Sequence, residues 1–61
     1  MRINETYSKQ QISALGLVEY PAKDIKARIF LNGTKVYFFE LDNNQQNYRL
    51  YSIINRRSFF L

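Results

Sequence analysis

An Asn-Gly dipeptide between two strand-like segments constrains the fold of this chain more than any other feature. In residues 24–31, apolar and polar side chains alternate, as expected for a strand with one buried side. Asn32 and Gly33 follow, and both residue types accept the positive φ values of a two-residue type I′ hairpin turn. Residues 34–41 are dense in β-branched and aromatic side chains, which favour a strand. The sequence therefore predicts an antiparallel hairpin around Asn32-Gly33.

A third strand is predicted over residues 47–54, after a polar run at 43–47 that is typical of a loop. We choose a register that places Glu40 opposite Arg49, because opposite charges across neighbouring strands attract. Pro21 cannot lie inside a central strand, so we place the crossing from helix to sheet there. The predicted sheet is thus a three-stranded antiparallel meander.

The start of a short helix is marked by Ser8 and Gln11. Their spacing matches a capping box, in which each side chain accepts a hydrogen bond from the other residue's backbone. Tyr7 and Ile12 occupy the two positions of a hydrophobic staple around that start. We therefore expect the helix to begin at Lys9.

The end of the same helix is marked by Gly16. Glycine suits the left-handed residue that follows a helix, and Leu17 would then pack back on Ile12, as in a Schellman motif. The helix is expected over residues 9–15, with Ile12 and Leu15 on its docking edge. Two turns are not stable alone, so this helix must pack on the sheet.

The predicted register divides the strand side chains between two faces. The first face is almost entirely apolar and is the expected seat of the helix. The second face interleaves aromatic and aliphatic side chains with cations, and a two-turn helix cannot cover both faces. The first face comprises Ile25, Ala27, Ile29, Leu31, Val36, Phe38, Tyr51 and Ile53, and the second face Phe30, Tyr37, Phe39, Leu41, Tyr48, Leu50 and Ile54 with Lys26, Arg28 and Lys35.

An exposed second face of this kind favours nucleic acid, either DNA or RNA, as the partner. Aromatic rings accept bases by stacking, and the cations beside them neutralise phosphates. The chain carries a formal net charge of +4, and cations gather towards its C-terminal end. The expected nucleic-acid-binding residues are Lys26, Arg28, Lys35, Tyr37, Phe39, Tyr48, Arg56 and Arg57.

A protein partner is the alternative for the same face. Small domains without disulfides often gain burial by oligomerising, and aliphatic side chains such as Leu50 and Ile54 suit such an interface. A homodimer is the expected assembly. A small inhibitor or adaptor that blocks a larger protein, as some phage and mobile-element products do, is a further possibility, because aromatic and Arg side chains also form protein hot spots.

Composition excludes most catalytic chemistry. The chain has neither His nor Cys, and its two glycines cannot form a Gly-rich phosphate loop. The five acidic residues form no visible cluster of oxygen ligands, so we expect no metal, no cofactor and no enzymatic activity. No apolar run approaches the roughly 18 residues of a membrane span, and no signal-peptide pattern is present, so we expect a cytoplasmic protein without a membrane partner.

The chain of 61 residues is therefore expected to form one α+β domain over residues 1–61, with one short N-terminal helix packed on the three-stranded meander. An additional short strand is expected near residues 2–3 or 57–61. The apolar ending at residues 58–61 should be buried as a fourth strand, as a cap over the second face, or as an arm on a partner subunit.

Overall fold

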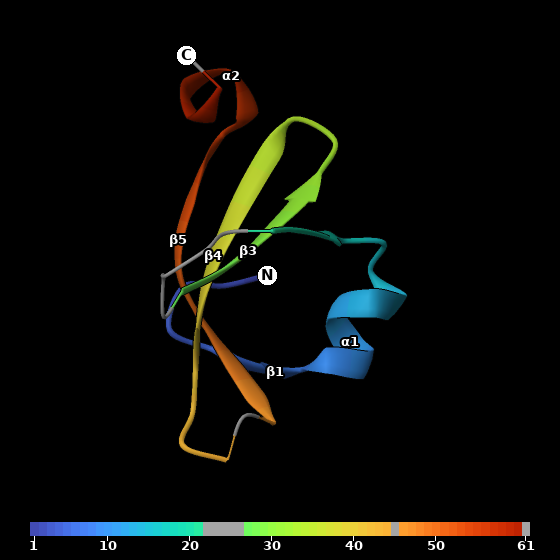
Figure 1. Ribbon diagram of the computed structural model, residues 1–61, viewed down its shortest axis with the longest axis vertical. Helices are drawn as coiled ribbons and strands as arrows, with labels where there is room; N and C mark the ends of the chain where they lie inside the picture. Colours follow the sequence, from blue (N-terminus) through green and yellow to red (C-terminus); the bar gives the residue numbers. More distant parts are fainter. Residues whose placement is uncertain (22–26, 45, 61) are drawn as a thin grey trace.

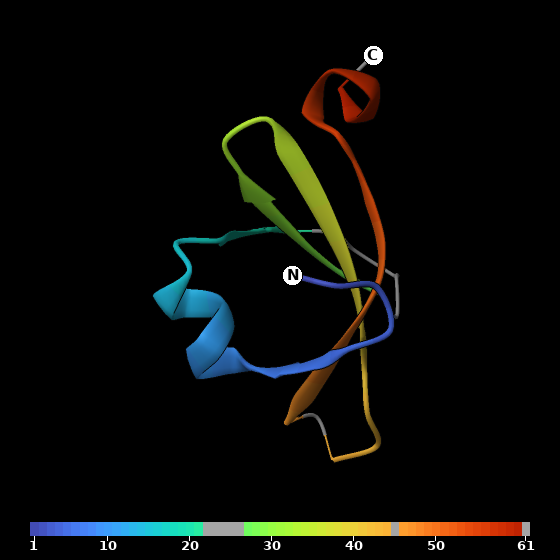
Figure 2. The same cartoon turned by 180° about the vertical axis from the view of Figure 1, so that it is seen from behind.

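The computed structural model describes residues 1–21, 27–44 and 46–60. Five strands form an antiparallel sheet in the order β1-β5-β4-β3-β2, and two short helices accompany it (Figures 1 and 2). The α+β class and the antiparallel meander agree with the prediction, whereas the sheet has more strands than the three predicted. The elements are β1 (Thr6–Ser8), α1 (Lys9–Ala14), β2 (Val18–Tyr20), β3 (Ala27–Asn32), β4 (Lys35–Leu41), β5 (Asn47–Asn55) and α2 (Arg56–Phe59).

Helix α1 has both predicted caps. The Gln11 N–H donates to the Ser8 hydroxyl at 3.1 Å, and the Ser8 N–H donates to the Gln11 side chain at 2.8 Å, which completes the capping box. At the other end, Gly16 has a φ of +80° and the Leu17 N–H donates to the Ile12 carbonyl at 3.4 Å, as a Schellman ending requires. These local signals therefore suffice to place the helix within one residue of its predicted end.

The first hairpin forms as predicted, but its register differs. Asn32 pairs with Lys35, so the turn residues are Gly33 and Thr34 rather than Asn32 and Gly33. Positive φ occurs at Gly33 (58°) and not at Asn32, and glycine at the first turn position is typical of type II′. The partner of each β3 residue moves two places along β4 relative to the prediction. Because strand side chains alternate with a period of two, this shift leaves every side chain of the hairpin on its predicted face.

The second hairpin contains a β-bulge that the prediction lacked. Glu40 pairs with Arg49, as expected, but Phe38 pairs with Ser52 instead of the predicted Tyr51. Tyr51 is the additional residue on β5, at the point where the register shifts. Because of this shift, each side chain of β5 that follows the bulge lies on the opposite face of the sheet from the one predicted.

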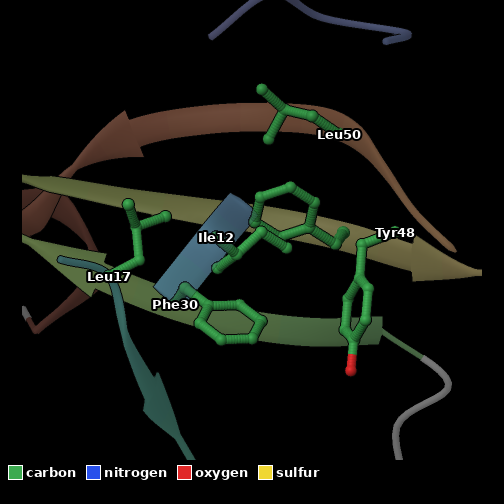
Figure 3. Packing of buried hydrophobic residues seen from close by; sticks show 6 residues of the cluster. Ile12, Leu17, Phe30, Tyr48 and Leu50 are labelled. Carbon is green, nitrogen blue, oxygen red and sulfur yellow. The ribbon is translucent and has the colours of Figure 1, made fainter. Parts of the chain in front are cut away.

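Helix α1 packs on the second face and not on the first. Ile12 and Leu17 are buried, with exposed fractions of 1% and 8%, whereas the predicted docking residue Leu15 is 52% exposed. Figure 3 shows Ile12 and Leu17 within the cluster that they form with side chains of the second face. The prediction of an exposed second face is therefore wrong. The buried cluster consists of Ile12, Leu17, Phe30, Phe39, Tyr48 and Leu50, with Tyr7, Tyr37, Leu41 and Ile53 packed against it.

The connection from β1 to β2 explains which face α1 covers. Both strands run parallel to β4, because each is separated from it by one antiparallel neighbour, and α1 links them across the sheet. Crossovers between parallel strands of one sheet are almost always right-handed, which leaves one face for the connecting helix. Neither β1 nor β2 is among the predicted strands. The face covered by the helix was therefore predicted from apolar content alone, and that prediction was wrong.

The first face is covered in part by helix α2, which occupies the C-terminal segment. Phe59 is half-buried and its ring packs edge-on against Tyr20 at 5.4 Å and Phe38 at 6.0 Å between ring centroids. The described part of this segment thus caps the first face, so the predicted fourth strand and the predicted cap over the second face are both wrong. Phe60 is 49% exposed, which contradicts its predicted burial, and Leu61 lies outside the described residues.

Candidate nucleic-acid interface

The three aromatic residues predicted to stack with bases lie in or against the core. Phe39 has no exposed surface, Tyr48 is 7% exposed, and Tyr37 is half-buried against the same cluster. Phe39 and Tyr48 form edge-to-face pairs with Phe30 at centroid distances of 5.4 and 5.9 Å. Their predicted exposure is wrong, because α1 covers the face on which they lie. Neither ring can stack with a base in this fold.

The predicted cations fall into separate places. Lys26 lies outside the described residues. Arg28 forms an exposed ion pair with Glu19 on the neighbouring strand β2, with 3.4 Å between Nη1 and Oε2. Lys35, Arg56 and Arg57, in contrast, come together where the β3–β4 turn meets α2, at one end of the molecule (Figure 1).

An open hollow of about 380 Å³ separates the β3–β4 turn from α2. The Arg56 backbone N–H donates to the Thr34 carbonyl at 2.7 Å, and the Arg56 Nη1 lies 3.5 Å from the Gly33 carbonyl oxygen. Lys35 Nζ donates to the Asn55 side-chain oxygen at 2.9 Å. These contacts hold the turn and the start of α2 together, and they place cationic side chains around the hollow. We call this region the α2 hollow, lined by Gly33, Thr34, Asn55, Arg56 and Arg57.

A continuous row of aromatic rings extends from the α2 hollow across the first face. The row starts at Phe60, where the Arg56 guanidinium carbon lies 5.5 Å from the ring centroid. From there, the centroids of successive rings are 4.9 to 6.2 Å apart. Phe38 and Phe59 form its half-buried middle, whereas the other three rings are 36–49% exposed. We call this set the ring row: Tyr20, Phe38, Tyr51, Phe59 and Phe60.

The ring row contains every exposed aromatic side chain of the molecule. All five tyrosines and five phenylalanines lie in the described part of the chain, and Tyr20, Tyr51 and Phe60 are the exposed ones. The sequence interpretation missed all three. Tyr20 lies in a strand that was taken for a connection. Tyr51 lies beside Phe38 on the first face, as predicted, but that face was expected to be covered by the helix. The adjacent phenylalanines at 59 and 60 did indicate that this segment packs against other residues, but the sequence did not indicate where in the fold it packs.

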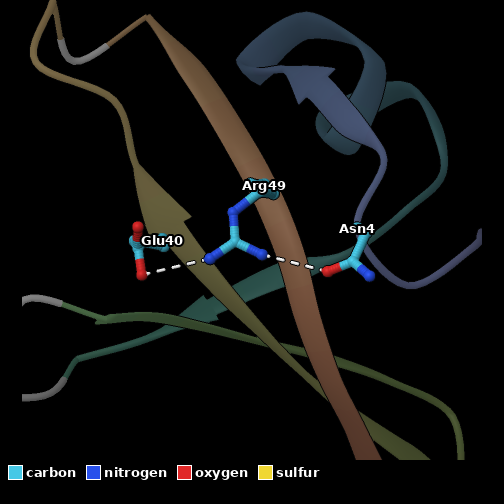
Figure 4. A network of polar contacts seen from close by, with 3 residues as sticks. All are labelled: Asn4, Glu40 and Arg49. Carbon is cyan, nitrogen blue, oxygen red and sulfur yellow. Dashed lines mark hydrogen bonds and ion pairs between the residues drawn. The ribbon is translucent and has the colours of Figure 1, made fainter.

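One described carboxylate, that of Glu40, lies away from this end of the molecule. Arg49 bridges Glu40, at 3.3 Å, and the Asn4 side-chain oxygen, at 3.1 Å, in a network on the other half of the sheet (Figure 4). Within residues 1–21, 27–44 and 46–60, the ion pairs are this one and Arg28–Glu19. None of the three cations around the α2 hollow therefore takes part in an ion pair with a described residue.

The loop between β4 and β5 is organised around the carboxylate of Asp42. The pKa of Asp42 is lowered from its ordinary value of 3.8, mainly because the Asn47 side-chain amide donates to it at 2.9 Å. The Gln46 backbone N–H donates to the other carboxylate oxygen at 3.1 Å and acts in the same direction. These bonds stabilise the ionised form and organise the loop, at the opposite end of the molecule from α2 (Figure 1). Asp42 has a structural role here.

The described residues provide neither a metal-binding cluster nor a membrane-spanning helix. They contain no group of three or more His, Cys, Asp or Glu side chains arranged to hold a metal ion. In the same ranges, neither helix has the length and apolar character needed to cross a membrane. No protein-family model, curated protein or solved structure matches this chain.

Proposed function

We propose that this protein is a non-catalytic binding protein whose partner is nucleic acid. The interface that we assign is the α2 hollow together with the ring row, in place of the second face on which most of the predicted residues lie. Of those predicted residues, Lys35, Arg56 and Arg57 remain in the proposal.

The observation that carries this proposal is the meeting of cations and exposed rings at one end of the sheet. Lys35, Arg56 and Arg57 have no carboxylate partner among the described residues, so their charges are available to phosphates. Of the exposed rings, Phe60 lies under the Arg56 guanidinium and Tyr20 packs against Phe60, whereas Tyr51 lies farther along the ring row, against Phe38. Rings beside cations are the two components that nucleic-acid-binding surfaces combine.

Salt dependence tests the electrostatic part of this proposal. Each phosphate contact releases about 0.7 counterion from a single strand, so three cations predict a slope near −2 for log affinity against log salt concentration. Binding of a fluorescent oligonucleotide is measured by anisotropy from about 50 to about 200 mM salt, where this slope corresponds to an affinity loss of about 20-fold.

A pair of charge-neutralising variants locates the binding site. Arg57→Gln is expected to reduce the salt slope by about 0.7. Lys9→Gln removes the same charge from exposed Lys9 on α1, which covers the second face, and is expected to leave the slope unchanged. Equal effects of the two substitutions would show that net charge alone attracts the oligonucleotide.

A homodimer is a second candidate, favoured by the edge strand β2. Its residues Val18, Glu19 and Tyr20 are all exposed, and Val18 is 67% exposed. Strand β2 ends the sheet order, and an open strand edge with apolar side chains can add a strand from another chain. Val18→Lys would block such pairing, so analytical ultracentrifugation should show a dimer for the wild type and a monomer for this variant.

A further inference from the structure

We infer that the nucleic acid bound at this end is single-stranded, with bases stacked on the exposed members of the ring row. This inference rests on the proposed function and specifies its substrate class. It begins from the division of the aromatic side chains into two sets. One set is enclosed under α1, whereas the other places Tyr20, Tyr51 and Phe60 at the surface of the first face.

Exposed rings favour single strands over duplexes because the faces of the bases are accessible only in single strands. In a duplex, the faces of the bases are covered by their neighbours in the stack, and the grooves expose base edges. In a single strand the base faces are accessible, and each base that stacks on an aromatic ring contributes binding energy whatever its identity. The ring row therefore suits unpaired bases.

The arrangement of cations fits the same ligand. The Arg56 guanidinium lies over the Phe60 ring, at the end of the ring row that adjoins the α2 hollow. Lys35 donates to the side-chain oxygen of Asn55, which leaves the Asn55 NH₂ group able to donate to a phosphate in that hollow. A strand with its backbone at the hollow and its bases along the rings would use both features together.

Helix α2 does not suit duplex recognition. It has four residues, so it is about 6 Å long, and it is held against the sheet by Phe59. Direct recognition of a duplex by a helix requires that helix to lie in the major groove with several side chains on base edges. The ring row and the short helix thus favour a single strand of DNA or RNA, read with little sequence preference.

Fluorescence anisotropy with matched probes tests this inference. The probes are labelled oligothymidylate and oligouridylate of about 15 nucleotides, and a mixed-sequence DNA duplex of the same length, each at about 150 mM salt. We expect the single strands to bind more tightly than the duplex. Equal or tighter binding of the duplex would overturn the inference. Tighter binding of oligouridylate than of oligothymidylate would identify RNA as the preferred single strand.

Ring variants provide the second arm of the test. Tyr51→Ala and Phe60→Ala should each weaken single-strand binding by about 5- to 150-fold, whereas Tyr51→Phe, which keeps the ring, should bind like the wild type. Leu15→Ala removes an exposed apolar side chain next to α1 and serves as the control. Amide NMR spectra verify that each variant is folded. Phe60 follows α2 and is 49% exposed, so its variant should fold even if Tyr51→Ala does not.

The outcomes separate the inference from the proposed function. If both ring variants bind single strands like the wild type, while Arg57→Gln still weakens binding, the inference fails and the proposed function stands. If no probe binds at about 150 mM salt, the proposed function fails and the inference fails with it.

Discussion

Neighbouring residues in this chain serve opposite sides of the sheet, and the contrast between Phe38 and Phe39 is the clearest case. Because successive strand side chains alternate, Phe39 enters the cluster under α1 while Phe38 joins the ring row. The same residue type therefore contributes to the core at one position and to the proposed interface at the next.

Replacing buried and exposed phenylalanines should separate these roles. Phe39→Ala is expected to cost about 3–5 kcal/mol, because it leaves a cavity in the cluster. A chain of 61 residues has a total stability of about 3–9 kcal/mol, so this variant should be largely unfolded or close to it. Phe60→Ala should cost below about 1 kcal/mol. Urea unfolding followed by circular dichroism measures both, and similar costs would contradict the assigned burial.

Gly16 provides a residue-scale test of the helix ending. Its φ of +80° is strained for any side chain, whereas nothing lies within 4 Å of the place where a Cβ would be. Gly16→Ala should therefore lower the free energy of unfolding by about 1–2 kcal/mol through the backbone alone. Gly16→Asn is the matched control and should cost less, since Asn adopts this conformation more readily. If both variants are as stable as the wild type, the Schellman ending is not required.

At the scale of elements, a helix, hairpin or strand could be predicted from the sequence only where nearby residues define it. The caps of α1, the two hairpins of the meander and the Glu40–Arg49 pair follow from residues close in sequence or from one complementary contact. The bulge at Tyr51 and the short strands β1 and β2 carry no such signal, because pairing with distant strands defines them. The second face was therefore identified correctly up to the bulge, after which Ile53 and not the predicted Ile54 packs against the cluster. The cover of this face was not identified, and the ring row was missed.

The β4–β5 loop offers a test at this scale through Asp42. Its pKa is lowered, so the folded loop favours the carboxylate: this contribution is present above pH 4 or so and is lost as the pH falls through the lowered pKa. Carbon-detected NMR should give Asp42 a midpoint below 3.8, and Asn47→Ala should raise it. Asn44 acts through its backbone, so Asn44→Ala should leave the midpoint in place. A midpoint unaffected by Asn47→Ala would contradict the assigned bond.

At the scale of the whole molecule, the two helices lie on opposite faces of the sheet, one over the main cluster and the other beside the proposed interface. Helix α1 encloses the main cluster on the second face, and α2 covers the first face only in part. The molecule extends 33 Å along its longest axis, with α2 and the β3–β4 turn at one end and the Asp42 loop at the other (Figure 2). Cations without a carboxylate partner among the described residues thus lie at one end with Phe60, and Asp42, whose pKa is lowered, lies at the other.

The most direct test of this account is a two-dimensional amide NMR titration with a single-stranded oligonucleotide at about 150 mM salt. We predict that the shifts concentrate on Tyr20, Tyr51, Arg57 and Phe60, and that the amides of α1 change little. Shifts concentrated on α1, or spread evenly over all exposed cations, would contradict the assignment of the interface to the α2 hollow and the ring row.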